Sequence, residues 1–146
     1  MSQQILVRRA GKDDWKGVLK LYETLDEEDL EYRFFNIHHL SAEEARKISV
    51  SRDHMTFLAF SGDTTIAECT LQSDGEVSIV VSPDFRGHGV ATHLFEYTLL
   101  AARERGMKRL HFFTLPSNSR MTGLGRALGF RLISHSVVEE EWVLDL

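Results

Sequence analysis

A strand-like run, a glycine-bearing turn and a helical pattern follow one another directly between Glu76 and Gly106. The apolar run 77–81 ends at a Ser-Pro-Asp sequence, and the helical pattern begins at Val90, immediately after the turn. Val90, Leu94, Tyr97 and Ala101 form one apolar stripe of that pattern, which is expected to be buried. The first turn of a helix carries unpaired N–H groups and a partial positive charge, and glycines let an anion approach the backbone closely. The segment therefore predicts a strand followed by a phosphate-binding helix start.

The glycines of this turn do not match two common nucleotide-binding motifs. The chain has no G-x-x-x-x-G-K-[ST] string, and the G-x-G-x-x-G pattern fails because Thr92 occupies its last glycine position. The turn does match R/Q-x-x-G-x-G/A through Arg86, Gly89 and Ala91. An ordinary strand–turn–helix, whose glycines serve only the backbone geometry, is the alternative interpretation.

The remaining hydrophobic pattern divides the chain into short, alternating elements. We expect strands at 5–9, 57–60, 65–71, 77–81, 110–115, 131–137 and 141–146, and helices at 15–25, 41–50, 90–105 and 118–128. Ser41 and Glu44 form a capping-box signature at the start of the helix at 41–50. With three helices before the strand at 57–60, the order is βααα-βββ-α-β-α-ββ. No repeat or linker divides the 146 residues, so a single domain spanning 1–146 is expected.

This order and the turn motif together resemble the GNAT N-acetyltransferases over nearly the full chain. The Leu128-Gly129-Phe130 triplet also matches the L-G-F sequence that follows the last helix in that family. The resemblance implies an α/β (α+β) fold of GNAT type, with a mixed, mostly antiparallel sheet and helices on both faces. It also implies that the enzyme is an acetyltransferase that uses acetyl-CoA as co-substrate.

The resemblance places the coenzyme along the strand at 77–81 and the turn that follows it. The implied cofactor-binding residues are Ile79, Val80, Val81, Arg86, Gly87, His88, Gly89, Val90, Ala91, Thr92 and Asn118. Asn118 matches the family's asparagine at the start of the last helix, although the same side chain could act only as the N-cap of that helix.

Transfer of an acetyl group to a lysine amine needs a base, because the reference pKa of that amine is ~10.4. Glu76, which precedes the strand at 77–81, is the predicted catalytic base, with Glu68 as second candidate and a merely solvated carboxylate as the alternative interpretation. In many family members a tyrosine seven residues after the Asn118 position protonates the leaving thiolate. That position is Gly125 here, so the acid is open, with water or Ser117 as substitutes.

The acceptor is expected to be a lysine on a basic protein, such as a nucleic-acid-associated one. Within the family, the segments Tyr32-Arg33-Phe34-Phe35 and Leu40-Ser41-x-Glu43-Glu44 resemble the acetyltransferase domain of Pat-type protein lysine acetyltransferases. We expect the acids at 26–31 to steer such a partner, and the substrate-binding residues to include His38, Glu43 and Glu44. The alternatives are a small amine, such as a polyamine or aminoglycoside, and a non-catalytic acyl-CoA-binding module.

Composition limits the other partners. The net charge of −5 disfavours direct nucleic-acid binding, and no apolar run is long enough to span a bilayer. Cys69 is the single cysteine, which fits a reducing compartment and is expected to be a small buried apolar residue. The histidines lack paired metal-ligand spacing, so no metal site is expected. We therefore expect a cytoplasmic monomer or weak dimer that binds neither membrane nor metal.

Overall fold

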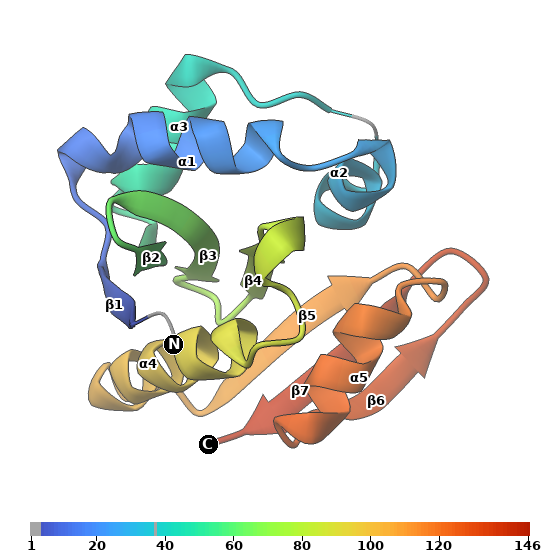
Figure 1. Ribbon diagram of the computed structural model, residues 1–146. Coiled ribbons are helices and arrows are strands. Elements are labelled where there is room, and N and C mark those ends of the chain that lie inside the picture. The colour runs from blue at the N-terminus through green and yellow to red at the C-terminus, as the bar shows by residue number, and fades with distance from the viewer. Residues whose placement is uncertain (1–3, 37) are drawn as a thin grey trace.

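Two antiparallel sheets that diverge from one another form the framework of the protein (Figure 1). The computed structural model describes residues 4–36 and 38–146. The first sheet has the order β1 (Ile5–Arg9), β2 (His54–Ser61), β3 (Thr64–Gln72) and β4 (Val77–Val81). The second has the order β5 (Arg109–Thr114), β7 (Glu140–Asp145) and β6 (Arg131–His135). An isolated parallel bridge between Glu76 and His111 joins β4 to β5, so the expected mixed sheet consists of two antiparallel sheets that meet there.

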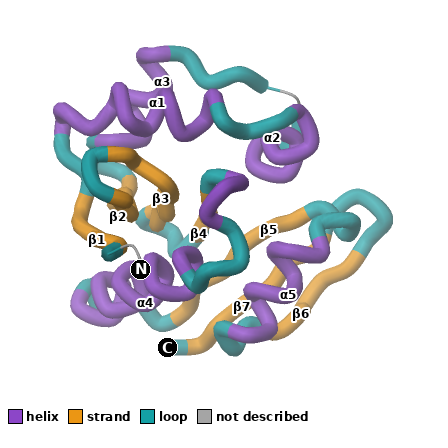
Figure 2. Tube along the Cα trace, in the orientation of Figure 1, coloured by secondary structure: helices purple, strands orange, loops and turns teal. Residues whose placement is uncertain are grey.

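Helices cover both faces of the first sheet (Figures 1 and 2). On one face lie α1 (Trp15–Glu23), α2 (Glu27–Phe34) and α3 (Ala42–Ser49), and their apolar side chains form one core cluster with Leu58 and Val80. On the other face, α4 (Val90–Glu104) packs against β2, β3 and β4 within a second cluster. The last helix, α5 (Ser119–Ala127), lies along the second sheet. The predicted fold class is confirmed.

Strand β4 lies between the two core clusters, and its side chains point alternately into one and the other. Val80 belongs to the cluster under α1–α3, whereas Val77, Ile79 and Val81 pack in the cluster under α4. Successive side chains of a strand point to opposite faces, so both faces of β4 are covered by protein. Cys69 on β3 is fully buried as expected, and burial raises the pKa of its thiol to about 12.

The helix starts follow the local sequence. Ser41 accepts a hydrogen bond from the Glu44 amide (3.1 Å), and the Glu44 carboxylate accepts one from the Ser41 amide (3.1 Å), which confirms the predicted capping box. Asp26 and Asp29 form the same arrangement at the start of α2. The acidic segment 26–31 is therefore mostly helical, and Asp29 within it is buried.

Some details differ from the expected elements. The strand expected at 57–60 is longer, since β2 spans His54–Ser61. Tyr97, expected on the buried stripe of α4, is 46% exposed, and the helix buries Phe95, Thr98 and Ala102 instead. Strand β6 ends at His135 rather than at Val137, which is 96% exposed. The local sequence pattern did not predict the exposure of these two side chains, because burial also requires a packing partner from elsewhere in the chain. Within the described residues, no helix has both the length and the apolarity needed to cross a membrane.

Candidate functional site

A cavity of about 350 Å³ opens where β4 and β5 diverge. Strand β4 pairs with β3 on one side, and beyond the Glu76–His111 bridge its other edge faces this cavity. An unpaired strand edge offers a row of backbone N–H and C=O groups. The remaining walls come from β5, α2, α5 and the turn before α4. The geometry suits an extended amide-bearing ligand that runs beside β4.

The turn between β4 and α4 is built from left-handed glycines. Gly87 has φ 80° and Gly89, the N-cap of α4, has φ 77°. Residues with a side chain rarely adopt this conformation. Nothing lies within 4 Å of the position where a Cβ on Gly89 would stand, so the first-turn N–H groups of α4 are open to an anion.

The structure brings the predicted coenzyme residues together with one exception. Those that line the cavity are Ile79, Val80, Val81, Arg86, Gly87, Gly89, Val90, Ala91, Thr92 and Asn118. His88 is exposed and lies outside the cavity wall. Asn118 is 8% exposed and accepts a hydrogen bond from the Met121 amide (3.1 Å), so it caps α5 and faces the cavity as well.

We expect Gly89→Val to weaken binding of CoA at least about tenfold, and by more than Arg86→Ala does. Valine at a positive φ costs of order 1–3 kcal/mol in backbone strain, and its methyl groups fill the space that a phosphate needs. Calorimetric titration with CoA measures the effect. Gly62→Val is the matched control, since Gly62 also has a positive φ (58°) and open surroundings but lies in the β2–β3 turn. Equal CoA affinity for the two variants would contradict the phosphate-site assignment.

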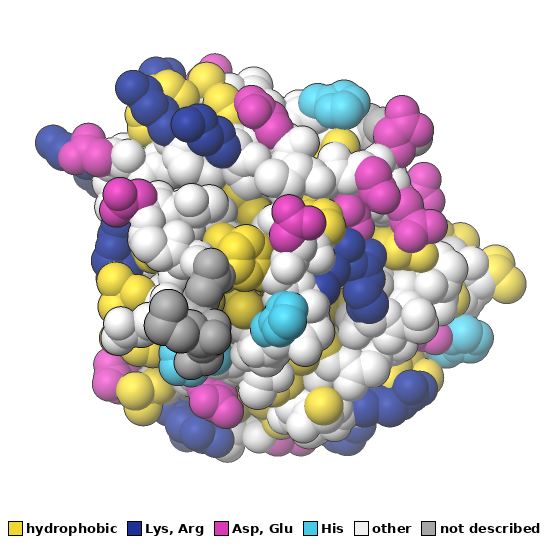
Figure 3. Space-filling model, viewed as in Figure 1, with side chains coloured by type: hydrophobic (Ala, Val, Ile, Leu, Met, Phe, Trp, Pro, Cys, Tyr) yellow, Lys and Arg dark blue, Asp and Glu magenta, His cyan; other side chains and the backbone are white. Residues whose placement is uncertain are grey.

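Asp29 ties α2 to the turn and to α5. Its Oδ1 atom accepts contacts from Arg86 Nη2 (2.9 Å) and Arg120 Nη2 (3.0 Å). Burial opposes the charge of this carboxyl, but the hydrogen bond from Arg120, the Asp26 amide and Arg86 outweigh it and hold its pKa below the usual range. Figure 3 shows basic side chains gathered beside acidic ones where α2 approaches the rest of the molecule. The acidic segment therefore contributes a structural ion pair, which the sequence did not indicate.

Glu76 is the available carboxylate in the cavity. Among the described residues that line it, Asp29 and Glu76 carry carboxylates, and Asp29 is held by its two arginines. No described residue forms a hydrogen bond or ion pair with the Glu76 carboxylate, whereas its backbone N–H donates to Asp74 Oδ1 (2.9 Å). A carboxylate without a fixed partner that faces a cavity can accept a proton from a ligand.

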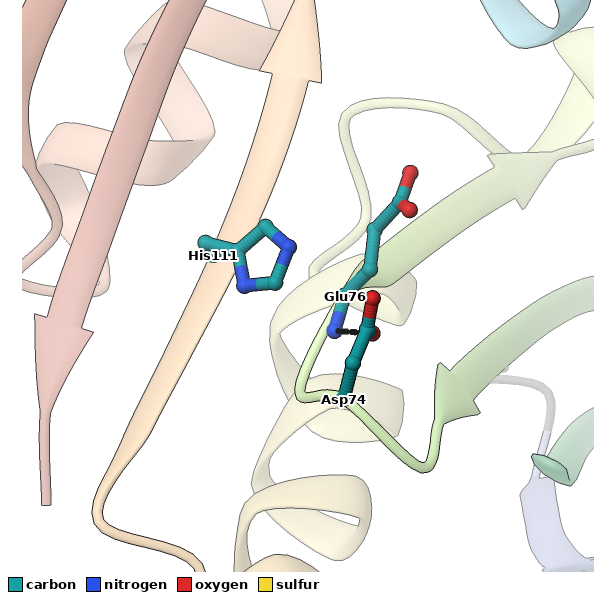
Figure 4. Close-up of side chains that lie close together, drawn as sticks. All are labelled: Asp74, Glu76 and His111. Atoms are coloured by element: carbon teal, nitrogen blue, oxygen red, sulfur yellow. Dashed lines mark hydrogen bonds between the residues drawn. The ribbon is translucent and has the colours of Figure 1, made fainter. Parts of the chain in front are cut away.

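His111 and Asp74 lie beside Glu76, as Figure 4 shows. Candidate ligand atoms of the three side chains lie within 4.8 Å of one another. Their residue types are those that bind Zn²⁺, but carboxylates and histidines also gather at a surface without an ion. Sequence spacing did not indicate this group, because His111 comes from β5 and meets Glu76 only through the parallel bridge.

Glu68, the second candidate base, is fully buried and does not line the cavity. Its two oxygens accept hydrogen bonds from the hydroxyls of Tyr22 (2.5 Å) and Thr70 (2.7 Å). Arg33 Nε in turn donates to the Tyr22 hydroxyl (3.0 Å). Glu68 thus belongs to a buried polar network, and the geometry favours Glu76 as base.

Packing explains why position 125 is a glycine. A Cβ at this position would stand 2.6 Å from Cζ of Phe112, whose ring also contacts Phe130 and stacks on Trp142. A side chain here would collide with an aromatic core, so the ring of Phe112 accounts for the glycine. Gly123, in contrast, has open surroundings.

The three predicted substrate-binding residues lie outside the cavity wall. His38 Nε2 pairs with Glu44 Oε2 (2.7 Å), and Glu44 also caps α3. Glu43 pairs with Lys47 (3.7 Å) on the exposed surface of the same helix. All three side chains therefore lie on the surface, outside the cavity that holds the predicted coenzyme residues.

Known proteins of one family resemble this chain. The sequence profile of the Acetyltransferase (GNAT) family matches residues 19–130. The GNAT domain of S. lividans PAT has 27% identity and a TM-score of 0.87, covering 96% of this chain and 89% of that one. The PaiA N-acetyltransferase of Thermoplasma acidophilum, solved in complex with coenzyme A, shares the fold with a TM-score of 0.80 at 13% identity, covering 98% and 99% of the two chains.

A curated relative, mycothiol acetyltransferase of Propionibacterium freudenreichii subsp. shermanii, is 28% identical over 118 residues. The match covers 69% of this chain but only 38% of that relative. The chain therefore spans well under half the length of the relative that it matches.

Proposed function

The chain belongs to the GNAT acetyltransferase family, and we propose that it transfers the acetyl group of acetyl-CoA to the ε-amine of a lysine on a basic protein. The proposal is carried by one observation: the same cavity is lined by the left-handed glycine turn at the start of α4 and by the carboxylate of Glu76, which has no hydrogen bond or ion pair among the described residues. Acetyl transfer from acetyl-CoA to an amine requires a binding site for the phosphates of the coenzyme and a base for the amine.

In the proposed reaction each group has one task. The free edge of β4 hydrogen-bonds the amide-bearing arm of the coenzyme, and the first-turn amides of α4 bind its phosphates. Glu76 takes a proton from the lysine ammonium, and the neutral amine attacks the thioester carbonyl. Holding both reactants in one cavity supplies much of the acceleration, because the thioester is already activated.

The charge of the surface favours a cationic partner. The chain carries a net charge of −5, and α2 presents exposed acids beside the cavity, while the start of α3 presents further exposed acids on the same layer of helices (Figure 1). A field of one sign raises the local concentration of an oppositely charged partner and speeds encounter. The 27% identity to the GNAT domain of S. lividans PAT, over 96% of this chain, adds to the Pat-like segments at 32–35 and 40–44.

A small-molecule acceptor is the second candidate, favoured by the relative named mycothiol acetyltransferase. The two candidates differ in where the acceptor is recognised. A small acceptor must make its contacts inside the cavity of about 350 Å³, whereas a protein also contacts the surface outside it.

Incubation with labelled acetyl-CoA separates the candidates. The arms are a basic protein, small amines and thiol-sugar amines, and no acceptor, with CoA release and label transfer measured by mass spectrometry. Label on a lysine of the basic protein is the expected result. Faster transfer to a small amine than to every protein tested would favour the small-molecule acceptor. If the protein binds acetyl-CoA but releases no CoA with any acceptor, it would be an acyl-CoA-binding module rather than an enzyme.

We expect the combined change Glu31→Lys and Glu43→Lys to raise KM for a basic protein several-fold, with little change for a short neutral peptide. Glu31 is exposed on α2, and Glu43 is exposed on α3. The control is Glu96→Lys with Glu104→Lys, two exposed acids of α4 that give the same change in net charge. Added salt should weaken the wild type more than the first variant, because screening removes long-range attraction. If both variants raise KM equally, net charge rather than this surface attracts the partner.

A further inference from the structure

Acetyl transfer leaves a proton-transfer step without an assigned residue. When the tetrahedral intermediate collapses, the C–S bond breaks and its electron pair goes to sulfur. A nearby acid lowers the barrier by protonating that sulfur. Position 125 cannot provide the acid, because the ring of Phe112 occupies the space next to it.

A side chain that supplies this proton in place of water must come from the other residues of the cavity wall. The guanidinium groups of Arg33, Arg86 and Arg120 do not release protons in proteins. Asp29 is held as an anion by its two arginines, and Glu76 is occupied by the proton of the amine. The wall also holds four hydroxyls, those of Tyr32, Ser78, Thr92 and Thr114.

Acidity distinguishes these hydroxyls. A phenol, with a reference pKa of ~10, lies within two units of a thiol at ~8.5, so proton transfer between them is nearly balanced. Aliphatic hydroxyls hold their protons far more tightly than a thiol does. Among the described residues of the wall, Tyr32 therefore carries the hydroxyl that suits this step.

The position of Tyr32 agrees with this role. It reaches from α2 across the cavity, and its hydroxyl donates to the backbone carbonyl of Ser117 (3.2 Å), next to the Asn118 cap of α5. This bond is longer than the ~2.7–2.8 Å usual for O–H···O, so the hydroxyl can leave it for a better acceptor. The contact fixes the phenol at the α5 side of the cavity, while Glu76 enters from β4.

We propose that Tyr32 is the general acid of the reaction, an inference that rests on the proposed acetyl transfer. The amine nitrogen bonds to the acetyl carbon, the C–S bond breaks, and the phenol proton passes to sulfur to give CoA thiol. The phenolate then regains a proton from solvent. The lysine ammonium loses two protons on its way to the amide, the first to Glu76 before attack and the second to solvent as the intermediate collapses. Since one proton returns to the phenolate, the net release is one proton, and protons and electrons balance.

The test compares Tyr32→Phe with Tyr97→Phe and Ser117→Ala. Tyr97 is an exposed tyrosine of α4 outside the cavity wall, and Ser117→Ala keeps the carbonyl while removing the alternative hydroxyl donor. We expect Tyr32→Phe to lower kcat about 10²-fold with CoA affinity within twofold of wild type, and both controls to match wild type.

The pH profile separates acid catalysis from a structural role. Wild-type kcat should fall at alkaline pH, where a phenol ionises and cannot donate, and Tyr32→Phe should lack that fall. Unchanged kcat in Tyr32→Phe, a lower kcat in Ser117→Ala alone, or a Tyr32→Phe profile that keeps the alkaline fall would each overturn the inference. A wild type that binds CoA but transfers to no acceptor would instead overturn the proposed function on which it rests.

Discussion

Replacing Glu76 by glutamine should lower kcat by about 10²–10⁴-fold while CoA affinity stays close to that of wild type, because a positioned base is removed and the shape is kept. The carboxylate faces the cavity without a described partner, so the amide should leave no new buried charge and break no ion pair. Stability should therefore change little, and the loss should appear in turnover.

The pH dependence gives the sharper part of this result. The defect of Glu76→Gln should shrink as pH rises, because free amine then forms without a base. Steady-state kinetics over a range of pH, with calorimetric titration of CoA, measure both quantities. Glu104→Gln, at an exposed acid on α4, is the control and should behave as wild type. A loss below tenfold would assign deprotonation to solvent, and a loss independent of pH would contradict a role as base.

The sequence predicted the elements well because their signals are local. The apolar alternation at 77–81 and the glycines of the following turn are contained in one segment, and the structure has β4 and α4 at those places. The capping box at Ser41 was equally local and was found. Such patterns depend on neighbouring residues, which a single sequence displays completely.

The parts that the sequence did not predict depend on distant contacts. Glu76 and His111 are far apart in the sequence and belong to different sheets. They meet because the two sheets touch at an isolated bridge between these residues. Asp29 is one of five acids in the segment expected to steer a partner, yet its charge is held by two arginines from outside that segment. Gly125 departs from the family pattern for a reason that only Phe112, on β5, makes visible.

Glu68 shows how the same limitation produced a candidate base. A carboxylate within a small, apolar strand resembles a functional residue, and the sequence alone cannot show what it contacts. The structure places it in a chain of hydrogen bonds in which buried Tyr22 donates to buried Glu68, and Arg33, which is partly exposed at the cavity, donates to Tyr22. Burial raises the pKa of the Tyr22 phenol, which therefore stays neutral and joins the two charges.

Changing Arg33 to methionine should reduce the free energy of unfolding by about 3 kcal/mol. Removing one partner of a buried charge pair leaves the other without compensation, which typically costs about 3–5 kcal/mol, and the lower end applies because Arg33 also lines the cavity. Urea unfolding measures the loss. Arg46→Met is the control, since Arg46 is exposed on α3 and only its guanidinium stacks on Trp15 (4.2 Å), an interaction worth roughly 0.5–1 kcal/mol.

A double-mutant cycle with Glu68→Gln identifies the cause of that loss. If Arg33 stabilises the fold by compensating the Glu68 charge through Tyr22, removing the charge first should make Arg33→Met less costly. The two changes together should then lose at least about 1 kcal/mol less than the sum of the single losses, because residues in one polar network are not additive. Additive losses would show that Arg33 acts through packing alone. A single-variant loss no larger than that of Arg46→Met would contradict the buried network as a source of stability.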